Sequence, residues 1–135
     1  MLHARMMVSH SWFEWGSGGS TIAALQYLNI QKIVTVDSDW SWLDRLRQRN
    51  DVRTAVGTGR LALLHADIGP TSDWGVPRNP LLDWSIYPSA VRDAGRSVWD
   101  TFVIDGRFRV ACFLSALMFA SASTRILVHD YPIRA

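Results

Sequence analysis

Short apolar runs alternate with segments of helical periodicity along most of the chain, and this alternation restricts the fold more than any other feature. We expect strands at 11–15, 33–36, 60–66, 101–104 and 125–128. Apolar residues recur at the spacing of a helix face in four further segments, 20–28, 37–49, 89–94 and 107–122. The segment 69–85 contains several prolines and has neither pattern. Alternating strands and helices are typical of an α/β fold with a mostly parallel sheet.

The length of 135 residues allows one domain with a substantial core, so we expect residues 1–135 to form a single domain. Hydrophobic residues make up 48% and charged residues 19%, which argues against disorder. The 14 basic and 12 acidic residues nearly cancel, so a nucleic-acid partner is not favoured. No apolar run reaches the roughly 18 residues of a membrane span. The single cysteine, Cys112, excludes an internal disulfide and fits a reducing compartment. We therefore expect a cytoplasmic protein with no membrane contact.

Polar residues or glycines stand at the end of each expected strand. The first strand runs into a glycine-rich segment that contains Glu14, Gly16, Ser17, Gly18, Gly19, Ser20 and Thr21. The other strands are followed by Asp37, by Asp67 and Ile68, by Asp105, Gly106 and Arg107, and by His129, Asp130 and Tyr131. The carboxyl ends of parallel strands meet at one edge of a sheet, where α/β proteins bind ligands. We therefore expect a ligand site at this edge.

The glycine-rich segment and Asp37 together indicate a ligand that contains adenosine. The glycines let the backbone approach a ligand and expose amides at a helix N-terminus, while an acid about twenty residues later can accept hydrogen bonds from ribose hydroxyls. Thr21 stands where the third glycine of a dinucleotide motif would be. A negative charge on Glu14 would repel a pyrophosphate but attract the cationic groups of S-adenosylmethionine. These observations favour S-adenosylmethionine and leave NAD open.

The chain resembles class I, Rossmann-like S-adenosylmethionine-dependent methyltransferases in four segments that match their motifs, 13–21, 36–37, 65–69 and 103–109. The resemblance covers about Phe13 to Tyr131 and looks like a small bacterial branch of that superfamily. It implies a three-layer Rossmann-like fold with strand order 3-2-1-4-5. It also implies that Glu14 and the glycine-rich segment hold the methionine part of S-adenosyl-L-methionine. By the same resemblance, the ribose is held by Asp37 and the adenine by Asp67 and Ile68.

The sequence leaves the methyl acceptor unidentified but suggests residues for the transfer. Asp105 is the first candidate for a base or an acceptor-orienting group and His129 the second, since a base is needed only if the acceptor loses a proton. Arg107, Asp130 and Tyr131 are candidate acceptor-binding residues. The acids Asp105 and Asp130 resemble those of metal-dependent catechol-type O-methyltransferases. Tyr131 replaces the asparagine of those enzymes, so we assign no metal.

Two other functions stay open at this point. One is an NAD-dependent oxidoreductase, which shares the glycine-rich segment and Asp37. The other is a non-catalytic protein that binds the cofactor or a partner without turnover.

The methyltransferase domain normally continues past its fifth strand, so we expect a truncated domain that lacks the usual last two strands. The strand at 125–128 would then lie at the edge of the sheet, where it could pair with a second copy in a homodimer.

Overall fold

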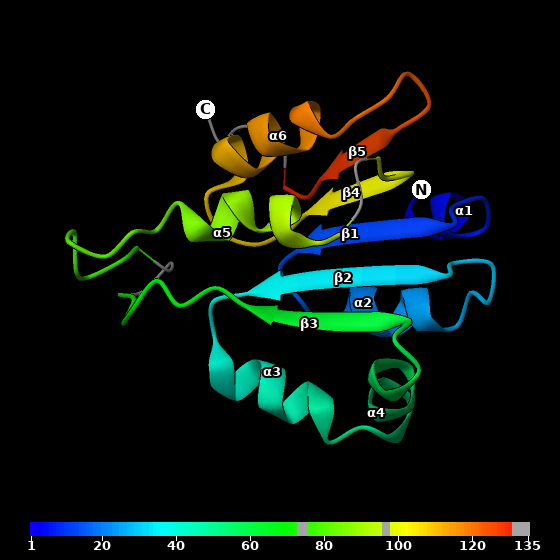
Figure 1. Ribbon diagram of the computed structural model, residues 1–135, viewed down its shortest axis with the longest axis horizontal. Coiled ribbons are helices and arrows are strands. Elements are labelled where there is room, and N and C mark those ends of the chain that lie inside the picture. The colour runs from blue at the N-terminus through cyan, green and yellow to red at the C-terminus, as the bar shows by residue number, and fades with distance from the viewer. Residues whose placement is uncertain (73–75, 96–97, 131–135) are drawn as a thin grey trace.

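A parallel sheet forms the centre of the molecule. The computed structural model describes residues 1–72, 76–95 and 98–130. The strands of the sheet are β1 (Ser11–Trp15), β2 (Lys32–Asp37), β3 (Leu61–His65), β4 (Thr101–Ile104) and β5 (Arg125–Val128). They lie in the order β3-β2-β1-β4-β5, and every neighbouring pair is parallel (Figure 1). The α/β class, the parallel sheet and the strand order expected from the sequence are confirmed.

Helices cover both faces of this sheet. They are α1 (Leu2–Met6), α2 (Gly19–Leu25), α3 (Trp40–Arg47), α4 (Asn50–Gly57), α5 (Ile86–Ser89), the 3-10 helix η2 (Ala90–Asp93) and α6 (Arg109–Met118). The helices α5 and α6 lie on one face of the sheet, and α2 lies on the other (Figure 1). This arrangement gives the expected three layers. None of the helices in the described parts of the chain is both long and apolar enough to cross a membrane.

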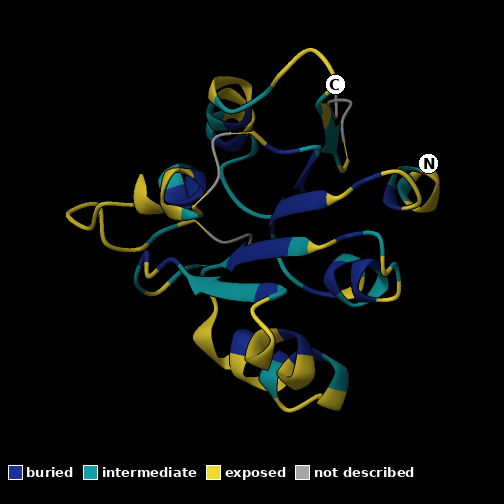
Figure 2. Cartoon of the chain, turned by 45° about the vertical axis from the view of Figure 1, so that its right-hand side comes forward, coloured by how far each residue is buried: buried dark blue, intermediate teal, exposed yellow. Residues whose placement is uncertain are grey.

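The side chains of β1 divide the core between the two faces. All residues of β1 and β4 are buried (Figure 2). Phe13 and Trp15 belong to a cluster with residues of α5 and α6, whereas Trp12 packs with residues of α2 and α4. Because successive side chains of a strand point to opposite faces, Glu14 shares the face of Trp12. The carboxyl group of Glu14 therefore lies on the α2 side of the sheet.

The region after β2 differs from the expected single helix over 37–49. Asp39 caps α3, and its Oδ1 accepts a hydrogen bond from the backbone N–H of Trp42 at 3.1 Å. The helix ends at Arg47, however, and a separate helix, α4, begins at Asn50. The sequence of α4 has few apolar residues, and only Val52 and Ala55 are buried. Val52, Ala55 and Val56 stand at helical spacing, so the pattern is present in the sequence, but the segment is only eight residues long.

The helix α6 is shorter than the expected 107–122 at both ends, and at its C-terminal end Phe119 leaves helical geometry with φ −116° and ψ 13°. Phe108 adopts a left-handed conformation, with φ 50° and ψ 44°, so helical geometry begins at Arg109. The short helix expected at 89–94 is found as α5 and η2. Between β3 and α5, the described residues contain no helix or strand and one isolated bridge, from Thr71 to Pro77. The absence of regular structure expected for 69–85 is thus confirmed for the part that the structure describes.

Candidate functional site

A cavity of about 570 Å³ lies at the carboxyl ends of β1, β2 and β4. It is lined by Gly16, Ser17, Asp37, Tyr87, Asp105, Gly106, Arg107, Phe108 and Arg109. Its volume is within the range of small-molecule sites, roughly 300–1,000 Å³. The fold thus brings together five residues named from the sequence as site candidates, Gly16, Ser17, Asp37, Asp105 and Arg107.

Gly16 and Gly106 meet at the floor of this cavity. A Cβ atom on Gly16 would lie 2.7 Å from the backbone nitrogen of Gly106, and Gly16 also has a φ of +96°. A Cβ atom on Gly106 would collide with the hydroxyl oxygen of Tyr87. The backbone N–H of Gly106 donates to the carbonyl oxygen of Trp15 at 2.8 Å. Only glycine allows the two chain segments to approach this closely.

Asp37 connects the end of β2 to the glycine-rich segment. Its Oδ2 accepts hydrogen bonds from the backbone N–H of Ser17 at 3.0 Å and from the Ser17 hydroxyl at 2.7 Å. Its Oδ1 accepts a hydrogen bond from the backbone N–H of Asp39 at 3.0 Å. An ionised carboxylate offers about four acceptor positions. One position therefore stays available for a ligand hydroxyl.

Glu14 does not line the cavity. It is fully buried, and its Oε2 accepts hydrogen bonds from Trp12 Nε1 at 3.2 Å and from the Ser20 hydroxyl at 2.8 Å. Its Oε1 accepts a hydrogen bond from the Thr21 hydroxyl. Burial raises the pKa of Glu14 above its ordinary value, and the hydrogen bonds from Thr21, Ser20 and Trp12 act in the opposite direction. The expected contact between the Glu14 carboxylate and a ligand is therefore not supported. Instead, the carboxyl group binds the hydroxyl groups of Ser20 and Thr21 in the glycine-rich segment.

The remaining cofactor candidates also lie outside the cavity lining, which includes none of Gly18, Gly19, Ser20 and Thr21. The backbone N–H of Gly18 donates to the Thr21 hydroxyl at 3.0 Å, so this part of the segment is held internally. Ile68 is fully buried in the core. The Asp67 carboxylate accepts a hydrogen bond from the backbone N–H of Gly69 at 2.9 Å.

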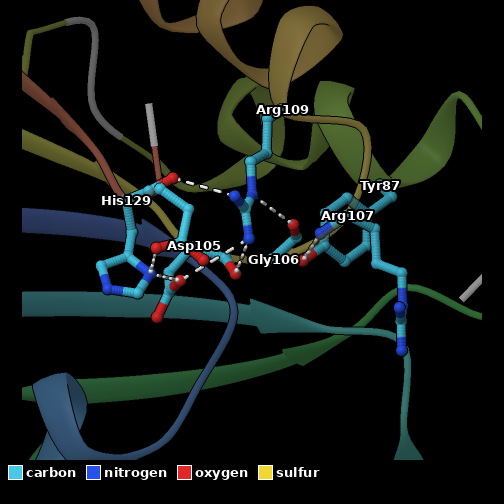
Figure 3. A network of polar contacts seen from close by, with 7 residues as sticks. Tyr87, Asp105, Gly106, Arg107, Arg109 and His129 are labelled. Atoms are coloured by element: carbon cyan, nitrogen blue, oxygen red, sulfur yellow. Dashed lines mark hydrogen bonds and ion pairs between the residues drawn. The ribbon is translucent and has the colours of Figure 1, made fainter. Parts of the chain in front are cut away.

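Asp105 and His129 form a pair at the ends of β4 and β5 (Figure 3). His129 Nδ1 lies 2.8 Å from Asp105 Oδ1 and 3.7 Å from Asp130 Oδ1. A carboxylate accepts this hydrogen bond from Nδ1, and in the neutral imidazole with that tautomer Nε2 is the acceptor. The pair can therefore accept a proton. Of these residues only Asp105 lines the cavity, whereas His129 and Asp130 do not. The third residue expected here, Tyr131, lies outside the described residues.

The two arginines of this region have different surroundings (Figure 3). The Arg109 guanidinium donates to the carbonyl oxygens of Gly106 at 3.3 Å, His129 at 2.9 Å and Asp105 at 3.5 Å. It thereby joins the segments that follow β4 and β5. The Arg107 side chain lines the cavity, and among the described residues its guanidinium has no hydrogen-bond or ion-pair partner. Arg107 is thus available to a ligand, whereas Arg109 is committed to the fold.

We expect Arg109→Ala to lower the free energy of unfolding by about 1 kcal/mol, because three carbonyl groups lose a donor that is partly exposed to solvent. The matched variant Arg107→Ala should stay within about 0.5 kcal/mol of the wild type. Urea unfolding monitored by tryptophan fluorescence measures both. Equal losses for the two variants would contradict the different roles.

Tyr87 and Cys112 are neutral groups beside the cavity. Burial raises the pKa of Tyr87 far above its ordinary value of 10.0, and its hydroxyl oxygen accepts a hydrogen bond from the backbone N–H of Arg107 at 3.3 Å. Burial raises the pKa of the Cys112 thiol to about 12. The thiol donates to the carbonyl oxygen of Arg107 at 3.3 Å, so it is not an activated nucleophile. Within the described residues, no group of three His, Cys, Asp or Glu side chains is arranged to hold a metal ion.

Comparison with known proteins identifies a structural relative. No family model matches the sequence, and no curated protein matches it. A crystal structure of a methyltransferase-like protein from Silicibacter pomeroyi superposes with a TM-score of 0.71 and 28% sequence identity. The match covers 98% of this chain and 70% of that chain. The protein has a methyltransferase-like fold. This likeness agrees with the Rossmann-like architecture and with the position of the cavity at the carboxyl ends of the strands.

Proposed function

We propose that the protein binds S-adenosyl-L-methionine in the cavity and transfers its methyl group to a second molecule. The main support is the cavity itself, in which the Gly16 backbone, Asp37 and Asp105 lie together in a methyltransferase-like fold. Gly16 and Gly106 contribute no side chain to the cavity, and the Tyr87 hydroxyl lies beside Gly106. The residues present therefore fit a ligand that needs close backbone approach and an acceptor for a hydroxyl group.

The cofactor assignments follow from these contacts and from the family resemblance. We assign the ribose hydroxyls to the acceptor position that Asp37 retains and the methionine part to the glycine-rich segment that begins at Gly16. The adenine is assigned to Asp67 and Ile68, on the resemblance alone. Glu14 acts indirectly in this proposal, since its hydrogen bonds hold Ser20 and Thr21 in place.

The catalytic assignment concerns the proton of the acceptor. When bound, S-adenosylmethionine supplies a methyl group activated by a sulfonium, so an acceptor with an O–H or N–H group must release one proton. The pair of Asp105 and His129 accepts this proton: Asp105 lines the cavity, and His129 Nδ1 lies 2.8 Å from its Oδ1. Asp105 is thus the member of the pair that meets the acceptor, and His129 is the residue that positions it.

Asp37→Ala is expected to weaken the binding of S-adenosylhomocysteine by about 10- to 100-fold, because one charged acceptor of ligand hydrogen bonds is lost. Isothermal titration calorimetry with S-adenosylhomocysteine and with NAD measures the effect. The control is Asp44→Ala, which removes an exposed aspartate outside the cavity lining and should leave the affinity unchanged. Tight binding of NAD without any response to S-adenosylhomocysteine would overturn the proposal in favour of an oxidoreductase.

A further inference from the structure

Phe108 forms an aromatic wall of the cavity. Its ring stacks on the ring of Trp84, with centroids 5.1 Å apart and an interplanar angle of 26°. Its edge contacts the ring of Tyr87 at 5.9 Å and 67°. Trp84 comes from the segment before α5, and Tyr87 comes from α5 itself. Two neighbouring aromatic rings therefore hold the Phe108 ring in position beside the cavity.

The backbone of Phe108 is unusual for such a large residue. Among the described residues, only Phe108 and Asp130 have a positive φ without being glycine. A left-handed conformation is costly for a bulky side chain, and such strain is concentrated at functional sites. Glycine would remove the strain, but it would also remove the ring from the cavity. The ring is only partly buried, so core packing accounts for only part of its presence.

Charged residues that follow β4 also line this cavity. Asp105 lines it and forms the pair with His129, which provides a proton acceptor. Arg107 adds a positive charge with no partner in the described part of the chain. A positive charge favours the ionised form of a phenol and disfavours an ammonium group. The cavity therefore combines an apolar aromatic surface with groups that suit an acidic hydroxyl.

We propose that the methyl acceptor is a small aromatic molecule with a phenolic hydroxyl, whose ring packs against Phe108. This inference rests on the proposed methyl transfer. The phenolic oxygen forms a bond to the methyl carbon, and the carbon–sulfur bond breaks with its electron pair left on sulfur. The phenolic proton passes to the pair of Asp105 and His129, of which Asp105 lines the cavity, so the products are an aryl methyl ether and S-adenosylhomocysteine. Phe108 determines specificity in this step and takes no part in the proton transfer.

Binding of phenol and cyclohexanol tests the proposal, because the two probes have similar size and differ in aromatic character. Both are titrated by NMR, with the Trp84 indole N–H signal as the readout, in the presence and in the absence of S-adenosylhomocysteine. We expect phenol to bind at least about 5-fold more tightly than cyclohexanol, in line with the energy of an aromatic pair. Phe108→Leu should abolish this preference, and Phe108→Tyr should retain it.

Two controls separate the possible outcomes. Phe113→Leu changes a phenylalanine of α6 that does not line this cavity, so it should keep the preference for phenol. Phe113→Leu should also leave the affinity for S-adenosylhomocysteine within about 2-fold of the wild type. Equal affinities for phenol and cyclohexanol, or an unchanged preference in Phe108→Leu, would overturn the aromatic acceptor. A failure to bind S-adenosylhomocysteine would overturn the proposed function instead, while the phenol titration without it still tests the aromatic wall.

Discussion

Gly16→Ala is expected to lower the free energy of unfolding by about 3 kcal/mol or more, as the sum of left-handed strain and overpacking. The added Cβ would lie 2.7 Å from the backbone nitrogen and 2.9 Å from the Cα of Gly106. Backbone atoms cannot turn aside as a flexible side chain can, so the ends of β1 and β4 must separate. The cavity lies between these ends, so ligand affinity should fall together with stability.

Urea unfolding of Gly16→Ala is compared with that of Gly57→Ala. Gly57 ends α4, its φ is not positive, and a Cβ there would meet nothing within 4 Å. Alanine at this helical position is expected to stabilise the protein by about 0.5–1 kcal/mol. Both substitutions replace glycine by alanine, so changes of opposite sign in the free energy of unfolding would isolate the effect of the β1–β4 contact. A loss below about 1 kcal/mol for Gly16→Ala would show that this contact is adaptable.

Glu14→Lys is expected to leave the protein unfolded at 25 °C, whereas Glu14→Gln should fold. Lysine would bury a charge among hydroxyl and indole donors, and the cost of an unpaired buried charge approaches the whole stability of a small domain, about 5–15 kcal/mol. Glutamine keeps an oxygen for Trp12 and Ser20, and its amide can donate to the Thr21 hydroxyl. Circular dichroism and size-exclusion chromatography distinguish the folded from the unfolded variant. A folded Glu14→Lys would show that the buried position of this side chain is wrong.

The buried carboxyl group of Glu14 should make the free energy of unfolding depend on pH. Burial raises the pKa of Glu14 in the folded protein above the value of 4.5 expected when the chain is unfolded. The folded state therefore binds the proton more tightly, and the stability that this group contributes is complete below pH 4.5. It is lost as the pH rises from 4.5 through the raised pKa. Between pH 4 and pH 8, the urea midpoint of the wild type should fall relative to the urea midpoint of Glu14→Gln, and measurements at pH 4, 6 and 8 test this. Parallel pH profiles would contradict this linkage, and Asp44→Asn serves as the exposed control.

The strands could be predicted because apolar residues gather in short runs between segments of helical periodicity. The site could be located because Gly16, Asp37 and Asp105 follow strands whose carboxyl ends meet at one edge of the sheet. Helix α4 was not predicted although Val52, Ala55 and Val56 stand at helical spacing, because eight residues are too few for periodicity alone, and contacts of Val52 and Ala55 with the core stabilise it. The bounds of α6 likewise depend on the backbone conformations of Phe108 and Phe119, which the sequence pattern does not reveal.

The sequence by itself determined the α/β class, the position of the strand ends and the residue types available there. Only the tertiary structure decided which of these residues share a cavity. It turned the Glu14 carboxyl group toward α2, placed Tyr87 against Gly106 and paired His129 with Asp105. It also left Arg107 open to a ligand while Arg109 binds three backbone carbonyls. Local periodicity depends on neighbours within one element, whereas these contacts join elements distant in the chain, so their distances are set only when the layers pack.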